Sequence, residues 1–158
     1  MKVNLVLWSI RNYKYYKNIQ SKEQYYQSYW TKNIIVKFET PKWELTEISK
    51  TIGEYTVFKA TAKIESEQTK NMNYLSPVVA WYTPDIQTFG IQNFTGLPGL
   101  PLELTAVFED GKIQYTAISI NLNPKEEVNV IRPSGNQMMI EPEYVEHIKK
   151  LNADRRRF

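Results

Sequence analysis

Regular alternation of apolar and polar side chains between Tyr55 and Ile64 is the feature that most restricts the fold of this chain. The apolar positions are Phe58, Ala60, Ala62 and Ile64, and the polar positions between them are Lys59, Thr61 and Lys63. Successive side chains of a β-strand point to opposite faces, so the pattern predicts a strand with one buried and one solvated face. Such strands are typical of antiparallel sheets, which can leave one face in water.

Several other segments have the composition of strands. They are rich in β-branched and aromatic residues, and Pro41 and Pro84 each end one run. Asp110-Gly111 is a strong signal for a two-residue hairpin turn. The expected strands are 33–39, 43–49, 55–64, 77–83, 102–109 and 112–120, with 127–131 as a further candidate. Residues 11–32 have no clean period and receive no assignment.

The C-terminal part of the chain changes to a helical pattern. Pro142 suits the first turn of a helix, and Tyr144, Ile148 and Leu151 recur at positions i, i+4 and i+7. We therefore expect a helix over residues 142–153 that lies against the sheet.

The first ten residues allow two interpretations. They faintly resemble a signal peptide, but Asn4 interrupts the apolar stretch, Arg11 follows it directly, and no small-residue cleavage site comes after it. An ordinary first strand is the preferred interpretation. No apolar run in the sequence reaches the roughly 20 residues that a membrane-spanning helix needs.

Length and composition favour a single domain over residues 1–158. Hydrophobic residues make up 42% of the chain and charged residues 23%, as in ordinary globular proteins. The fold class that we predict is mainly β (α+β), with a curved antiparallel sheet or half-barrel of about six strands and a C-terminal helix. The formal net charge of +3 is too small to indicate a nucleic-acid partner.

The sequence offers little catalytic or metal-binding chemistry. It has no cysteine, which excludes thiolate metal sites and cysteine nucleophiles. The single histidine, His147, is interpreted as a surface residue, because no G-x-S-x-G elbow accompanies it. Glu143 and Glu146 are neighbours on the predicted helix, but the helix dipole favours acids near its start. We expect no catalytic residue, metal or cofactor, and a hydrolase with a cryptic carboxylate pair is the lowest-ranked alternative.

A basic and aromatic stretch near the N-terminus raises the question of nucleic-acid binding. Between Arg11 and Lys17, basic side chains are interleaved with tyrosine rings, as in proteins that bind single strands. Lysine stems packed over aromatic strand residues are the preferred explanation, so nucleic acid is not an expected partner.

A stretch rich in glycine and proline, residues 85–101, predicts a stiff loop between two strands. Gly96 and Gly99 allow backbone angles or close approaches that other residues do not, whereas Pro98 and Pro101 fix φ and remove hydrogen-bond donors. Two interpretations stay open. The loop either turns a corner and fills one end of the sheet with leucine side chains, or it forms the rim of a binding site for a ligand or partner.

The strand before this loop contains two adjacent aromatic residues, Trp81 and Tyr82. They point to opposite faces, so one is expected in the core and the other at a cavity or rim, and the period alone does not decide which. With the loop they form the candidate binding set. This set is Trp81, Tyr82, Gly96, Leu97, Pro98, Gly99 and Leu100.

The same region resembles a known family. Residues 80–86 (AWYTPDI) and 93–104 (NFTGLPGLPLEL) are similar to the GLPGLI family of Bacteroidetes proteins, named for its hexapeptide. The stretches WEL at 43–45 and KTIG at 50–53 resemble the strand pair that precedes the motif, so the resemblance covers roughly residues 33–120.

The chain departs from the family pattern at three positions. Pro101 stands where the family hexapeptide ends in Ile, Ile91 stands where a Pro is usual, and Val57 stands where a Cys is common. Family members usually have a signal peptide and a longer N-terminal region, so residues 1–32 are interpreted as a divergent or truncated start.

The resemblance implies a periplasmic or secreted protein of unknown activity, and it supplies no catalytic residue. The preferred hypothesis is a non-enzymatic, envelope-associated binding protein that holds a lipid, a peptide or a partner protein beside Gly96–Leu100. The alternative is a structural or interaction module that pairs with another chain through an exposed sheet edge.

Overall fold

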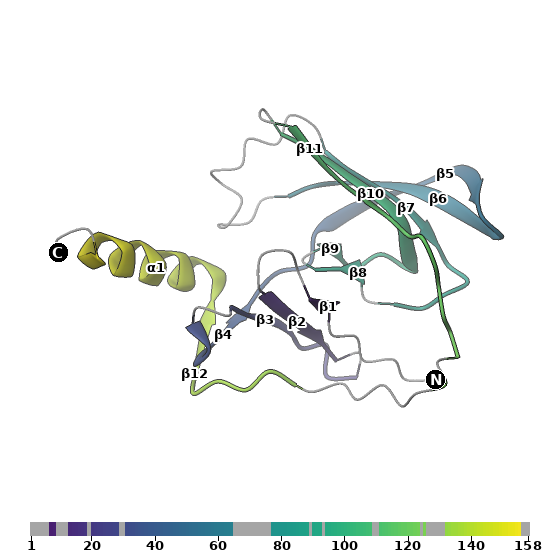
Figure 1. Cartoon of the computed structure of the whole chain (residues 1–158). Coiled ribbons are helices and arrows are strands. Elements are labelled where there is room, and N and C mark those ends of the chain that lie inside the picture. The colour runs from purple at the N-terminus through teal and green to yellow at the C-terminus, as the bar shows by residue number, and fades with distance from the viewer. Residues whose placement is uncertain are drawn as a thin grey trace.

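The computed structural model describes residues 7–8, 13–18, 20–28, 31–64, 77–88, 90–92, 94–108, 111–123, 125 and 132–155, and the statements below concern this part of the chain. It is mainly β with one C-terminal helix, which confirms the predicted fold class. The strands form two open five-stranded sheets and one small ribbon, which lie one above the other in Figure 1.

Sheet A contains the N-terminal strands and one strand from the C-terminal part of the chain. Its order is β1 (Leu7–Trp8), β2 (Tyr13–Lys17), β3 (Gln24–Ser28), β4 (Ile34–Lys37) and β12 (Gln137–Ile140). The pairs are antiparallel except for β4 and β12, which are parallel. The helix α1 (Glu141–Arg155) follows β12 directly.

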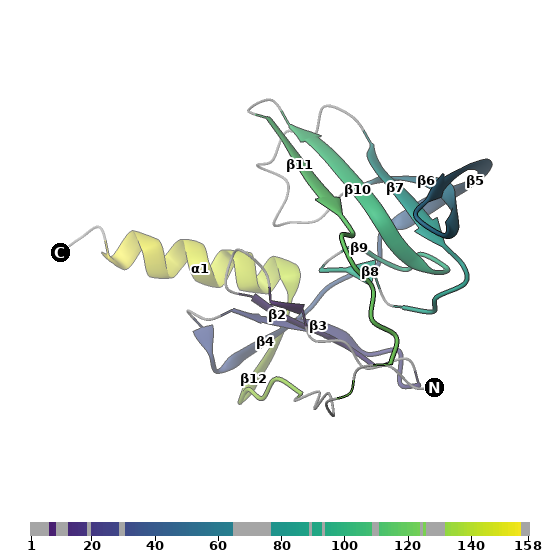
Figure 2. The same cartoon turned by 45° about the vertical axis from the view of Figure 1, so that its right-hand side comes forward.

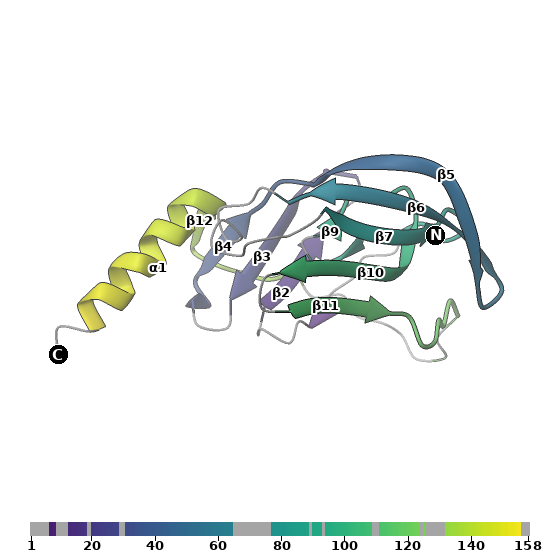
Figure 3. The same cartoon turned by 90° about the horizontal axis from the view of Figure 1, so that it is seen from above.

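Sheet B contains the strands of the middle of the chain, all antiparallel. Its order is β11 (Gly111–Thr116), β10 (Leu100–Phe108), β7 (Val78–Thr83), β6 (Tyr55–Lys63) and β5 (Lys42–Ile52), as the view from above shows (Figure 3). The ribbon of β8 (Gly90–Ile91) and β9 (Phe94–Thr95) lies beneath this sheet, on the side of sheet A.

The core of sheet B follows the alternation predicted from the sequence. Ala60 and Ala62 are buried, and Phe58 and Ile64 pack beside them, so the apolar face of β6 is the inner one. The buried cluster is Ala60, Val78, Ala80, Tyr82, Phe94, Leu97, Leu104 and Ala106. β10 and β11 form the expected hairpin pair, with Phe108 opposite Gly111.

The core of sheet A is built from aromatic rings. Tyr26 is 1% exposed and its ring centroid lies 5.9 Å from those of Phe38 and Tyr144, so the tyrosine of α1 closes over β3 and β4. On the opposite face, the Tyr16 ring stacks on Tyr25 at 4.9 Å. Figure 2 shows α1 above one end of sheet A, on the same side as sheet B and to the left of it.

A set of polar side chains joins the two sheets. The Gln24 amide of β3 donates to the carbonyl oxygen of Phe38 and to Oγ1 of Thr40, at 3.0 and 2.8 Å. Its oxygen accepts from Oγ1 of Thr95 at 3.1 Å, and the indole nitrogen of Trp43 donates to the Thr95 carbonyl oxygen at 2.8 Å. The start of β3 is therefore connected to β9, and β9 is connected to the start of β5.

The structure differs from the sequence expectation in the arrangement of strands. One sheet of about six strands was expected, but β1, β2, β3, β4 and β12 form a second sheet, in which β4 is the expected strand 33–39, and α1 packs on that sheet. Residues 85–101 were expected to be a loop, yet they contain the β8–β9 ribbon and the start of β10. The candidate strand at 127–131 lies outside the described residues. The described helix cannot cross a membrane, since it is neither long nor apolar enough.

The burial of Tyr26 predicts a loss of stability at alkaline pH. Desolvation raises the pKa of Tyr26 far above its usual range, and the nearby Glu141 raises it further. A pKa raised in the folded state gives stability that is complete below about pH 10, where the unfolded tyrosine ionises, and is lost as the pH rises further. We expect Tyr26→Phe to reduce this alkaline loss by about 1.4 kcal/mol for each pH unit above 10. Urea unfolding of both proteins at pH 8 and pH 11 checks it, and equal losses would contradict it.

Candidate functional site

The structure places the predicted binding residues in the core, at the end of sheet B, and on its other face. Tyr82 and Leu97 are 7% and 5% exposed and belong to the core of sheet B, where they contact protein. Pro98 is exposed and Leu100 is half-buried at the start of β10, opposite Thr83. Trp81 lies on the opposite face of β7, so the seven residues do not form one continuous surface.

The glycines of the loop permit close backbone approach. A Cβ atom on Gly99 would overlap the carbonyl oxygen of Thr83, where β7 ends. A Cβ atom on Gly96 would overlap Cγ2 of Thr40, and its φ of +91° is a conformation that favours glycine. With Leu97 in the core, these contacts support the interpretation that the loop turns a corner and fills one end of sheet B.

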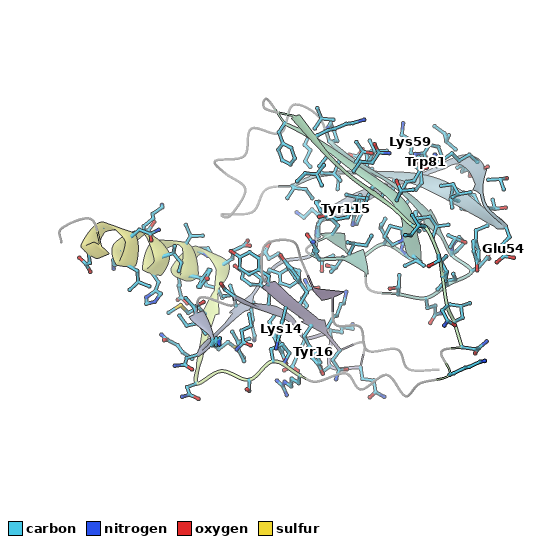
Figure 4. All side chains as sticks on the ribbon, viewed as in Figure 1. Lys14, Tyr16, Glu54, Lys59, Trp81 and Tyr115 are labelled. Atoms are coloured by element: carbon cyan, nitrogen blue, oxygen red, sulfur yellow. The ribbon has the colours of Figure 1, made fainter. Side chains whose placement is uncertain are left out.

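Trp81 lies on the solvent side of sheet B, where its ring contacts a lysine that is paired with a glutamate. The Lys50 ammonium of β5 lies 4.4 Å from the centroid of the indole ring, a cation–π contact, and 2.5 Å from Oε2 of Glu103 on β10. In the register of the sheet, Lys59 and Glu103 are the direct neighbours of Trp81 on the two flanking strands. Figure 4 shows Lys59 and Trp81 on the upper side of sheet B, with Tyr115 on the lower side.

We call this side the outer face of sheet B. It consists of the side chains that share the face of Trp81 in the register of the sheet, and two of them, Val57 and Thr83, are buried. Outside the irregular segment between Leu45 and Ser49, the charged residues of this face are Lys42, Glu44, Lys50, Lys59, Lys63, Glu103 and Lys112. The face therefore carries five lysines and two glutamates around one indole ring.

The carboxylates of Glu143 and Glu146 form contacts within or at the start of α1. Oε2 of Glu143 accepts a hydrogen bond from the backbone nitrogen of Ile140, which caps the start of the helix. Glu146 pairs with Lys149 at 2.7 Å, and this lysine lowers the pKa of the Glu146 carboxyl. Across the part of the chain that the structure describes, no three acidic, histidine or cysteine residues gather in a way that could hold a metal ion.

The tyrosines of the basic N-terminal stretch pack within sheet A. Tyr13 and Tyr15 contact the Tyr26 ring with centroids 5.4 and 5.7 Å away, and Tyr16 stacks on Tyr25. These rings therefore pack against other rings of the same sheet, as expected for tyrosines on a strand.

Sequence reasoning named Trp81 but missed Lys50 and Glu103 as its partners. They come from β5 and β10, and only the register of the sheet brings them together. The alternation of β6 did place Lys59, Thr61 and Lys63 on one polar face, and that signal points to the outer face.

Comparison with known proteins returned no match. No family model matches the chain, and neither a curated protein nor a solved structure is significantly similar to it. The function is therefore argued from the residues of the site.

Proposed function

We propose that this chain is a non-enzymatic, envelope-associated binding protein of the GLPGLI family, and that it binds through the outer face of sheet B around Trp81. The observation that supports the proposal is a half-buried indole on a solvated sheet face, fixed by Lys50 and Glu103. An aromatic ring whose position is set before binding offers contact area at low cost in conformational entropy.

The proposal moves the binding surface away from the Gly96–Leu100 loop. Leu97 and Tyr82 already fill the core, so a ligand could contact them only after the loop had opened. Trp81 is the member of the candidate set that combines a large apolar surface with charged neighbours. The loop then acts as the rigid end of the sheet that carries the site.

Native mass spectrometry of the protein purified from its own host tests this function. We expect a bound molecule or partner on the unmodified protein, and its loss from Trp81→Ala. Leu151→Ala on α1 is the matched control, because this exposed apolar residue lies on the other sheet's helix. The same occupancy in Trp81→Ala as in the control would contradict the proposal.

A second candidate, an interaction module that pairs through a sheet edge, is favoured by the regularity of β11. Its register with β10 runs without a shift from Thr116 to Gly111, whereas the other edge strand, β5, is irregular between Leu45 and Ser49. An irregular edge resists pairing with another strand, and a regular one is a template for it.

The hydrogen bonds of β11 identify its outward groups. The Ala117 nitrogen donates to the Leu102 carbonyl oxygen at 2.8 Å, and hydrogen-bonded pairs alternate along an antiparallel ladder. Tyr115 and Ile113 therefore bond to β10, while the backbone of Lys112, Gln114 and Thr116 points away from it, to an edge that no described strand pairs with.

Proline substitution separates edge pairing from folding. We expect Gln114→Pro to remove an outward N–H group and abolish self-association while the fold is kept, since proline is tolerated on an outer edge. Ile113→Pro removes a ladder bond and should destabilise the fold itself by about 3 kcal/mol. Sedimentation at micromolar concentrations gives the oligomeric state, and an unmodified chain that is monomeric would remove the support for self-pairing.

A further inference from the structure

We infer that the outer face of sheet B binds an acidic oligosaccharide, a glycan chain that carries carboxylates on its sugar rings. The inference rests on the proposed binding function of this face and names its ligand class. It is carried by three features of the face: its excess of lysines over acids among the described residues, an opposed lysine pair, and a row of hydroxyl and amide side chains beside the indole.

Lysines outnumber acids among the described residues assigned to this face. Glu103 is paired with Lys50, which leaves Glu44 as the remaining acid against four other lysines. Within the described part of the chain, no carboxylate forms an ion pair with Lys42, Lys59 or Lys63. A face of this kind is complementary to a ligand with several negative charges.

Two of these lysines lie directly opposite each other. Lys42 of β5 and Lys63 of β6 are register partners, and both are exposed. Opposed like charges on one sheet face destabilise the pairing of the two strands. An anion bound between the two ammonium groups would remove this repulsion, so the fold itself favours an anionic occupant here.

The side chains between the lysines suit a sugar chain. The row beside Trp81 contains Thr61, Val79, Thr105 and Gln114 in register across four strands. Hydroxyl and amide groups both donate and accept hydrogen bonds, as sugar hydroxyls require. A pyranose ring can pack beside the indole, whose ring face Lys50 covers, while ring carboxylates reach the Lys59 ammonium.

A single-stranded nucleic acid is the competing polyanion, and the arrangement of rings favours the glycan. Proteins that bind single strands stack successive bases on successive aromatic side chains. The row through Trp81 contains Lys59, Glu103 and Thr116 and has no second ring. Two charged side chains and one threonine stand where further rings would be needed.

Titrations with defined oligosaccharides test the inference. The probes are hexagalacturonate, with six carboxylates, and maltohexaose, an uncharged chain of equal length, each followed in ¹⁵N–¹H spectra of the labelled protein. We expect saturable binding of hexagalacturonate alone, with the largest shifts at Trp81 and Lys59. Lys59→Gln should weaken binding about tenfold, as expected for the loss of one charge-assisted contact. Lys37→Gln, at an exposed lysine of sheet A, should bind as the unmodified protein does.

Each alternative outcome has a clear meaning. Equal binding of maltohexaose, or equal weakening by Lys37→Gln, would overturn the inference, because charge on this face would then play no part. Binding of a 15-nucleotide single-stranded DNA with no binding of hexagalacturonate would assign the face to nucleic acid instead. If the Trp81-dependent occupancy in native mass spectrometry is present but neither polyanion binds, the ligand class is wrong while the proposed function stands.

Discussion

Replacing Gly99 by alanine is expected to lower the free energy of unfolding by about 3 kcal/mol. The new Cβ would overlap the Thr83 carbonyl oxygen, and Thr83 lies opposite Leu100 in the pairing of β7 and β10. Since backbone cannot move aside as the end of a flexible side chain can, the two central strands would have to separate at this end. With a typical urea dependence of about 2 kcal/mol per molar, the midpoint of unfolding should fall by roughly 1.5 M.

Gly53→Ala is the matched control for this prediction. Gly53 lies in the tight turn between β5 and β6 with φ of +58°, and a Cβ atom there would meet no atom within 4 Å. It therefore reports the cost of the left-handed backbone alone, about 1 kcal/mol. Equal destabilisation by the two substitutions would show that the corner at Gly99 does not depend on close packing against β7.

Replacing Leu104 by alanine is expected to cost about 3 kcal/mol, within the range of 2–5 kcal/mol for buried leucines. Leu104 is fully buried on β10, between β7 and β11, and belongs to the cluster that includes Ala80 and Tyr82. The small alanines around it leave few long side chains able to fill the cavity. Loss of the outer-face site should follow, because β10 also positions Glu103.

Leu45→Ala provides the comparison on the same sheet. Leu45 is 54% exposed at the irregular part of β5, so its truncation should change stability by no more than about 0.5 kcal/mol. Thermal unfolding followed by circular dichroism measures both variants. If Leu104→Ala were as mild as Leu45→Ala, sheet B would not be the cooperative core described above.

Sheet B was largely predictable from the sequence because buried and more exposed positions alternate along much of β6, β7 and β10. Alternation in β6 and β10 indicated the buried set. The Asp110-Gly111 signal correctly predicted that β10 pairs with β11, although Gly111 itself lies in β11, opposite Phe108. The helix was also predictable, since its apolar spacing and first-turn acids are local features.

One strand of sheet A, β4, was predicted as part of 33–39, but the sheet as a whole was not predictable, for two physical reasons. In β3, Tyr25, Tyr26, Gln27 and Ser28 are all buried, so polarity does not alternate along the strand. The partner of β4 is β12, about a hundred residues later and parallel, and its sequence QMMI has no strand signal of its own. Neither feature is visible in a short window of sequence.

The candidate site was also predictable only in part. The alternation of side chains along a strand predicted that Trp81 and Tyr82 face opposite ways. The structure adds that Tyr82 is the inner residue, because it packs with the buried Ala80 and Leu104. The contact of Trp81 with Lys50 depends on the pairing of three strands from distant parts of the sequence. No local pattern carries that information.

In the sequence, the strands of sheet B lie between β1–β4 and β12 of sheet A, and this order has a consequence for synthesis on the ribosome. All strands of sheet B have been synthesised once residue 116 is added, before β12 and α1 are made, so this unit can become ordered first. Its companion must wait for β12 and α1, and until then β4 has an open edge and the Tyr26 ring lacks its cover. A premature stop after residue 116 would therefore leave sheet B able to fold and the tyrosine-rich sheet exposed to aggregation.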